Sequence, residues 1–321
     1  MSRDRALVLG TANAILAASL FGTLGPMSRF AGDHGVGAMA FTTWRALLGL
    51  AFLVTLIAAR HQTRSAIGTL VALDRRGRAS LAIAALMGLG INAAMFSAFS
   101  LVPIALALLM FYTYPAGVAV LDVLLGNERI TASRLAALGL SSTGVVLVLL
   151  GSMGAGADVS VDALGILLGL GAAACQVTFI AVSRDGYHTV AADTASVVVL
   201  SASVVGAAAL AVLVGQGAEL VAPFGNPATW VILVLSGVFA GGLSTVLFLR
   251  AIRFVGGTRT GILMLFEPVV GAFLAALLLG EALVPVQVVG GALVLAGAAV
   301  LQLSSAPEHE PLVEAGAGPV V

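Results

Sequence analysis

The fold is decided by two related stretches of sequence, Leu109-Met110-Phe111-Tyr112-Thr113-Tyr114-Pro115 and Ile262-Leu263-Met264-Leu265-Phe266-Glu267-Pro268. Each continues through apolar residues to a glutamate, Glu128 or Glu281, and the proline and the glutamate are 13 residues apart in both copies. Both stretches lie in runs of about 20 apolar residues, the length that crosses the hydrocarbon core of a bilayer. The pattern predicts a duplicated membrane unit with a helix-breaking proline inside a span.

The composition also indicates a membrane protein. The 321 residues are 60% hydrophobic and 9% charged, whereas soluble domains carry about 25% charged residues. A net charge of zero gives no bulk attraction to nucleic acid. The single cysteine, Cys175, excludes an internal disulfide and a multi-cysteine metal site, and we expect it to be a packing residue. We therefore predict an all-α membrane protein with no cofactor and no bound metal.

Charge-poor runs bounded by Arg, Pro, Gly or acidic residues predict ten transmembrane helices. Their predicted limits are 6–28, 37–59, 80–100, 104–125, 132–151, 163–183, 192–214, 228–249, 260–279 and 285–303. Residues 1–151 and 152–303 form the two predicted five-helix repeats, and residues 304–321 are predicted to be a disordered cytoplasmic tail. Because five is an odd number, the two repeats must be inverted relative to each other in the membrane.

The arginines predict the orientation. Thirteen lie on one side of the predicted topology: Arg3, Arg5, Arg60, Arg64, Arg75, Arg76, Arg78, Arg129, Arg134, Arg184, Arg250, Arg253 and Arg259. The other side holds only Arg29. Since arginine is enriched on the cytoplasmic side, we expect both termini to be cytoplasmic and the protein to lie in a bacterial inner or plasma membrane.

The repeat extends beyond the proline stretches. Ala17-Ala18, Thr23 and Ser28-Arg29 match Ala172-Ala173, Thr178 and Ser183-Arg184 at a shift of 155 residues. The first span has the arginines and apolar run of a secretory signal peptide. Its counterpart in the sixth span predicts instead that it belongs to the mature fold.

These features resemble the EamA family of the drug/metabolite transporter superfamily. Phe266-Glu267-Pro268 through Leu278-Leu279-Gly280-Glu281 is the most specific match, Tyr112-Thr113-Tyr114-Pro115 through Glu128 is its partner, and Arg45 is also similar. Gly126-Asn127-Glu128 departs from the family, which more often has Gly directly before Glu. The resemblance covers about residues 8–303. It implies a secondary carrier, often an exporter of amino acids or related metabolites, with a cavity lined by the first four helices of each half.

Arg45 is predicted to lie roughly 12 Å deep in the second span, at about 1.5 Å per residue. An ionised side chain there costs at least ~2.5 kcal/mol, so it must face the interior of the bundle. We predict that it binds a carboxylate or phosphate of a substrate, because a guanidinium holds such groups bidentately. The alternative is a structural pair with Glu267 or with carbonyls at a helix end. Trp44, Tyr112 and Tyr114 are predicted to form walls of the same cavity.

Glu267 is predicted to lie about 10 Å inside the ninth span, beside Pro268. A carboxylate there can bind an ammonium, or it can carry a proton because desolvation favours the neutral form. The alternative is a salt bridge to Arg45 that only stabilises the bundle. The first repeat has Tyr114 at this place, an asymmetry that suits a polar ligand with two unlike ends.

Other candidates have a structural alternative of similar weight. Asn92, Gln176 and Thr245 lie near the middles of the third, sixth and eighth spans, where each can contact a substrate or make an interhelical hydrogen bond. Pro115 and Pro268 are predicted to be kinks needed for gating, although membrane helices also tolerate proline without such a role.

Acidic residues near the predicted span ends form a last group. Asp122 lies close to the cytoplasmic end, where it can pair with Arg129 or form part of an inner gate. Glu128 and Glu281 precede the fifth and tenth spans, where the helix dipole favours a carboxylate.

Enzymatic patterns are weak. The four histidines fall in predicted loops or the tail without ligand spacing, and without lysine there is no phosphate loop. We predict a secondary transporter that exports amino acids or related small metabolites by alternating access, with proton coupling as an option. The alternatives are an exporter of lipophilic cations and, less favoured, a lipid-flipping protein or a membrane-embedded enzyme. The expected partners are the metabolite and the lipid bilayer; the oligomeric state stays open, a homodimer included.

Overall fold

The computed structural model describes residues 3–99, 101–102, 104–126, 131–152, 162–279 and 283–303, and within these ranges it contains helices and no strand. The first half contains α1 (Arg3–Gly22), α2 (Leu24–Asp33), α3 (Ala38–Ala59), α4 (Thr63–Val71), α5 (Arg75–Phe99), α6 (Ile104–Phe111), α7 (Tyr114–Leu124) and α8 (Ala132–Ser152). The second half contains α9 (Ala163–Asp185), α10 (Ala192–Leu213), η1 (Gly217–Gly225), α11 (Ala228–Leu235), η2 (Ser236–Leu243), α12 (Ser244–Val255), α13 (Gly257–Met264), α14 (Glu267–Leu279) and α15 (Pro285–Leu303).

The described helices account for all ten predicted spans. Nine stretches are long and apolar enough to cross a membrane: Arg5–Asp33, Ala38–Ala59, Arg75–Phe99, Ala105–Leu124, Ala132–Gly151, Ala163–Asp185, Ala192–Leu213, Ala228–Val255 and Gly257–Leu278. A tenth apolar helix, Pro285–Leu301, is shorter. The prediction of an all-α membrane protein with ten helices in two inverted repeats is thus confirmed. The predicted tail, residues 304–321, lies outside the described residues.

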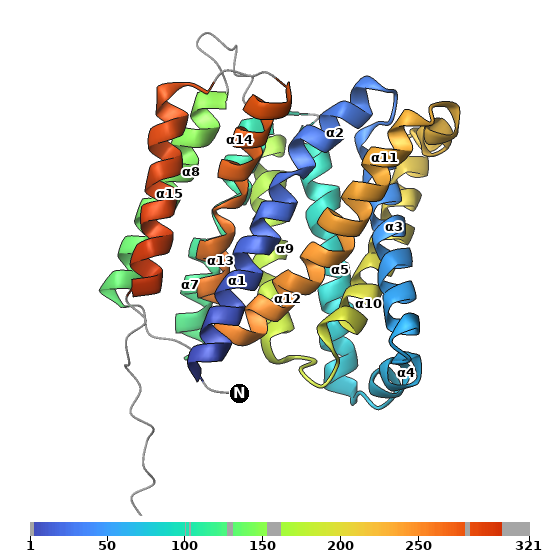
Figure 1. Ribbon diagram of the computed structural model, residues 1–321, viewed down its shortest axis with the longest axis horizontal. Helices are drawn as coiled ribbons and strands as arrows, with labels where there is room; N and C mark the ends of the chain where they lie inside the picture. Colours follow the sequence, from blue (N-terminus) through green and yellow to red (C-terminus); the bar gives the residue numbers. More distant parts are fainter. Residues whose placement is uncertain are drawn as a thin grey trace, which may run out of the picture.

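The two halves interleave in one bundle. Helix α5 packs against α9 and α1 packs against α12, so this contact between the halves occurs twice with the roles exchanged. Helix α3 contacts its own counterpart α10, and α8 contacts its counterpart α15. Figure 1 shows α8 and α15 side by side at one edge of the bundle. The start of α1 and the end of α15 lie at the same end of the bundle. We call this end the arginine-rich face, because it is the side to which the predicted topology assigns thirteen arginines.

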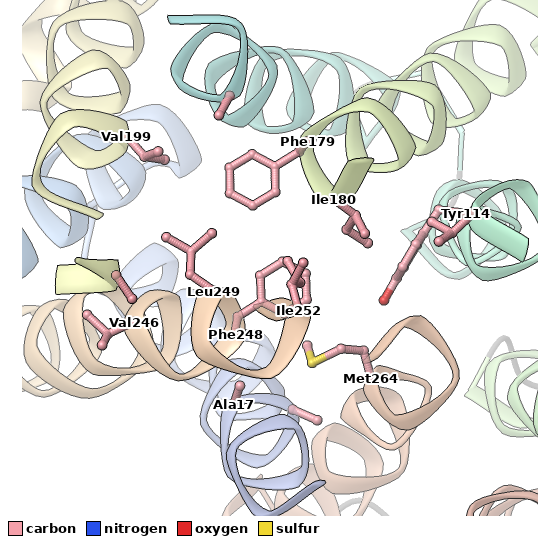
Figure 2. Close-up of a cluster of buried hydrophobic side chains, with 14 of the residues drawn as sticks. Ala17, Tyr114, Phe179, Ile180, Val199, Val246, Phe248, Leu249, Ile252 and Met264 are labelled. Atoms are coloured by element: carbon pink, nitrogen blue, oxygen red, sulfur yellow. The ribbon is translucent and has the colours of Figure 1, made fainter. Parts of the chain in front are cut away.

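The hydrophobic core is shared by both halves. Its largest cluster contains Tyr114 of α7, Phe179 and Ile180 of α9, Leu249 of α12 and Met264 of α13. Figure 2 shows these side chains converging in the space between the helices. Because burying apolar area is the main favourable term in folding, each half depends on the other for much of its stability.

Close backbone contact between α3 and η2 depends on glycine. A Cβ atom at Gly49 would lie 2.7 Å from the carbonyl oxygen of Gly237 and 2.8 Å from the amide nitrogen of Gly242. These distances are too short for any side chain, so only glycine lets the two helices approach this far. The contact brings α3 of the first half against the eighth span of the second half.

Two short elements were not predicted from the sequence. The longest predicted loop, residues 60–79, contains α4, and α5 already begins at Arg75. The connection between α10 and α11 contains the 3-10 helix η1. Both lie between spans, where the long apolar runs that indicate membrane helices are missing.

Candidate functional site

Arg45 lies on α3, facing the interior of the bundle. One terminal nitrogen, Nη1, donates to the carbonyl oxygen of Ala240 at 3.3 Å, and the other, Nη2, donates to Oδ1 of Asn92 at 3.3 Å. The residue is only partly buried although it lies within a span. The guanidinium is therefore held by neutral acceptors on two other spans, and the residue as a whole retains some accessible surface.

The carbonyl of Ala240 is presented by the π-helical segment η2. A π-helix interrupts the usual hydrogen-bond pattern and is often found at functional sites. The oxygen also accepts from Oγ of Ser244 at 2.7 Å. Sequence reasoning did not identify this group; the nearest signal was the Gly241-Gly242 pair beside it.

Asn92 is itself held in place while it bonds to Arg45. Its Nδ2 donates to the carbonyl oxygen of Gly88 at 2.8 Å, one turn earlier on α5. This bond directs Oδ1 toward Arg45. The predicted interhelical hydrogen bond of Asn92 is thus made, to Arg45, and its contact with a substrate stays a prediction.

Glu267 is the first residue of α14, directly after a break in the ninth span. The break arises because Leu265 and Phe266 donate to carbonyls three residues back, at 3.1 and 3.2 Å, and because Pro268 has no N–H to donate. The same break occurs between α6 and α7, where Thr113 donates to Met110 at 3.3 Å before Pro115. Both prolines therefore begin a new helical segment in mid-membrane.

The carboxylate of Glu267 attracts the guanidinium of Arg45 and lies within electrostatic reach of the Tyr112 hydroxyl. No direct salt bridge is formed between Arg45 and Glu267, both of which are described and partly buried. The two opposite charges thus come from different halves and remain close but separate. Of the structural alternatives for Arg45, the tight ion pair with Glu267 is absent here, and a bond to a backbone carbonyl is made, at Ala240.

Tyr112 and Tyr114 are buried beside this pair, with 6% and 2% of their surface exposed. Both interact electrostatically with Glu267, and the ring of Phe111 lies 5.4 Å from that of Tyr112 and 5.2 Å from that of Tyr114. In Figure 2 the Tyr114 side chain points from α7 into the space between the helices, toward Met264. Two tyrosines therefore lie within electrostatic reach of the carboxylate, and the ring of Phe111 packs against both.

Three other candidates lie elsewhere or are already satisfied. Trp44 donates from Nε1 to the carbonyl oxygen of Leu220 at 2.9 Å and packs on Phe224 and Trp230, so its contacts are with η1 and α11. The hydroxyl of Thr245 donates to Gly241 of its own span at 2.6 Å. Gln176 is buried on α9. None of these contacts joins the three residues to Arg45 or Glu267.

Asp122 lies at the arginine-rich end of α7 and is 5% exposed. Its Oδ1 accepts from Nη1 of Arg184 at 2.9 Å, and its Oδ2 accepts from Oγ1 of Thr258 at 2.8 Å. The pairing that we predicted, with Arg129, falls outside the described residues, as do Glu128 and Glu281. Sequence reasoning used Arg184 in the charge count and in the repeat but not as a partner of Asp122, and it did not consider Thr258.

Comparisons with known proteins agree with this architecture. Among solved structures 28 chains match, and one of them, a crystal structure titled only "Crystal structure of protein", aligns with a TM-score of 0.72. It covers 92% of this chain and 96% of its own at 20% identity, which supports the fold alone. A search of curated proteins finds no match.

A family model identifies the chain more closely. The model of the EamA-like transporter family matches residues 8–150 and again residues 163–303. The two matches together span most of the sequence and include both proline stretches. The chain is therefore a multi-pass membrane protein that belongs to the EamA-like transporter family.

Proposed function

We propose that this transporter carries a small zwitterionic or anionic metabolite, with Arg45 and Glu267 as its two recognition groups. The supporting observation is that the two charges attract each other within the spans without forming a direct salt bridge. A guanidinium suits a carboxylate, and a carboxylate suits an ammonium. An amino acid carries both groups on one carbon atom.

The origin of the two charges suits alternating access. Arg45 comes from α3 in the first half, and Glu267 comes from α14 in the second half. A ligand bound by both would contact both halves and could favour one of their arrangements through its differential affinity. Asn92 and the Ala240 carbonyl would hold the guanidinium in place between transport events.

We further propose export from the cytoplasm, with both termini cytoplasmic in a bacterial inner membrane and with Glu267 carrying a proton in exchange. The excess of arginine on one predicted side supports the orientation. The carboxylate has both a cation and a hydroxyl close by, so its protonation would change its attraction to each.

The first experiment identifies a ligand and then tests the carboxylate. The purified protein is screened against a metabolite library by thermal shift, since a ligand that binds only the folded state raises the melting temperature. Glu267→Gln in proteoliposomes should then abolish flux of that ligand driven by a proton gradient, while the protein stays folded. Asp33→Asn, an exposed acid at the end of α2, is the matched control and should transport normally. Unchanged flux in Glu267→Gln removes the coupling role.

The aromatic rings around Glu267 favour a second candidate, an exporter of lipophilic cations. Tyr112 and Tyr114 interact electrostatically with the carboxylate and pack with Phe111, and aromatic faces attract cations. Competition decides between the two: displacement of a bound cationic dye by amino acids supports the metabolite carrier, and a dye that binds equally well to Arg45→Gln supports the cation exporter.

A further inference from the structure

Asp122 joins three helices from both halves at the arginine-rich face. It lies on α7, its ion pair to Arg184 reaches the end of α9, and its hydrogen bond to Thr258 reaches the first turn of α13. The backbone N–H of Thr258 also donates to Oδ2, at 3.3 Å. A buried carboxylate needs such partners because an unpaired charge in the interior is strongly unfavourable. All three contacts depend on the three helix ends being together.

The local backbone brings these ends together. Gly256 has φ of +80°, a conformation that favours glycine, and it starts α13 directly after α12. A Cβ at Gly257 would lie 2.9 Å from Cγ2 of Ile180 and 3.1 Å from Cγ1 of Val118, which leaves no room for a side chain. The start of α13 can therefore lie directly against α7 and α9.

A hydrophobic layer lies between this cluster and the candidate site. Ile180 of α9, Ile252 of α12 and Met264 of α13 are each at most 3% exposed. Figure 2 shows them meeting Tyr114, which contacts Glu267 electrostatically. Along α13 and into α14 the order is Thr258, Met264 and Glu267, so this layer lies between the polar cluster and the carboxylate.

The repeat does not supply the same cluster on the opposite face. At the shift of 153 residues that relates Pro115 to Pro268, Asp122 corresponds to Ala275 and Thr258 corresponds to Ala105. Arg184 corresponds to Arg29 at the shift of 155 residues found for the first and sixth spans. The arginine is thus present in both copies, but the acid and the hydroxyl are present in one.

We propose that Asp122, Arg184 and Thr258 form a one-sided latch that makes the conformation closed toward the arginine-rich face the resting state. Inverted repeats exchange their arrangements when the transporter turns over, so the opposite state would have to form its closure with Ala275 and Ala105 in place of these groups. The latch is lost in that state. The inference rests on alternating access in the proposed function, but not on the identity of the substrate.

Accessibility of a buried cysteine tests the latch without any substrate. In a Cys175→Ala background, Met264→Cys places a single thiol in the hydrophobic layer. A membrane-impermeant maleimide is applied from the arginine-rich face of oriented vesicles, and the labelling rate is measured. Asp122→Ala should raise this rate about tenfold, a factor that corresponds to about 1.4 kcal/mol in the resting equilibrium.

A matched control uses the second acid bound to the same arginine. Asp185 accepts from Nε of Arg184 at 2.7 Å, but its side chain is 73% exposed. Exposed ion pairs contribute little, so Asp185→Asn should leave the labelling rate unchanged. Thr258→Val and Asp122→Asn remove less of the latch and should give smaller increases in the labelling rate. If Asp122→Ala does not fold, these two variants test the proposal.

The reciprocal variant moves the latch to the other face. Adding Ala275→Asp and Ala105→Thr to Asp122→Ala should raise labelling of the cysteine at position 264 further, because the opposite face then has the acid and hydroxyl beside Arg29. Equal labelling rates in the parent, Asp122→Asn, Asp122→Ala and Thr258→Val would overturn the proposal. Loss of flux in Glu267→Gln alone does not bear on it, because the labelling needs no ligand.

Discussion

At the scale of single residues, the main feature is an arginine with spare hydrogen-bonding capacity. A guanidinium has five N–H donors, and Arg45 uses two of them in bonds of 3.3 Å to neutral acceptors, which is longer than the usual 2.7–3.2 Å. Among the described residues no acceptor is bonded to the remaining donors, which can meet a ligand of opposite charge. The nearby carboxylate of Glu267 attracts the group without neutralising it through a direct contact.

Removing the support of Arg45 should weaken transport more than it weakens the fold. Asn92→Ala deletes one hydrogen bond, a contribution of about 1 kcal/mol, so we expect the KM for the transported ligand to rise roughly fivefold with a small change in melting temperature. Thr245→Val is the matched control, since that hydroxyl bonds only to its own span. Similar KM values for the two variants would contradict the positioning role.

Sequence reasoning identified the charges but not how they are held. Arg45 and Glu267 were predicted to face the interior because a charge in lipid is too costly, and this argument needs no coordinates. The rotation of each helix against its neighbours decides which way Trp44 points, which carbonyl Arg45 meets and which groups bond to Asp122. That rotation results from packing across the whole bundle, which a single sequence with apolar residues on every side of a helix does not reveal.

At the scale of secondary structure, the spans that contribute to the site are those with irregular backbone. The fourth and ninth spans break before Pro115 and Pro268, and the eighth contains the π-helical η2. The prolines were visible in the sequence, and both breaks follow from the missing N–H. The π-helix has no such signature in the sequence, although the close contact of Gly49 with Gly237 and Gly242 falls within it.

Filling that contact should destabilise the protein. Gly49→Ala places a methyl group within 3 Å of two backbone atoms of η2, and overpacking typically costs about 1–3 kcal/mol. We expect a melting temperature several degrees lower and reduced transport, since Ala240 would move relative to Arg45. Gly139→Ala on α8, where a Cβ meets nothing within 4 Å, should keep or slightly raise the melting temperature. An equal fall in melting temperature in both variants would contradict this, because it would show that the loss of stability does not come from the contact at Gly49.

At the scale of the whole molecule, the inverted repeat explains why the two halves pack as they do. Helices α5 and α9 pack together in the same manner as α12 and α1, and ten spans return the chain to its starting face. The length and spacing of the apolar runs already predicted this arrangement. What they did not show is that one end of the bundle has a polar cluster whose acid and hydroxyl are missing from the other copy.

The orientation can be measured with reporters at the two ends of the bundle. Alkaline phosphatase, which is active only outside the cytoplasm, should be inactive when fused after Leu303 and active when fused after Val214, at the end of α10. Green fluorescent protein should give the opposite pattern. Phosphatase activity at Leu303 would invert the topology and contradict the arginine rule on which it rests.

The contacts of the Phe248 ring restrict which substitutions this chain can accept during evolution. It stacks on Phe179 of α9 with 6.1 Å between ring centres, and its edge meets Phe21 of α1 at 6.4 Å. Helices α1 and α9 occupy corresponding places in the two copies, so one side chain touches both descendants of the same ancestral helix. A substitution there disturbs the two copies together, and lineages of this protein should therefore accept changes at these three aromatic positions in concert rather than one at a time.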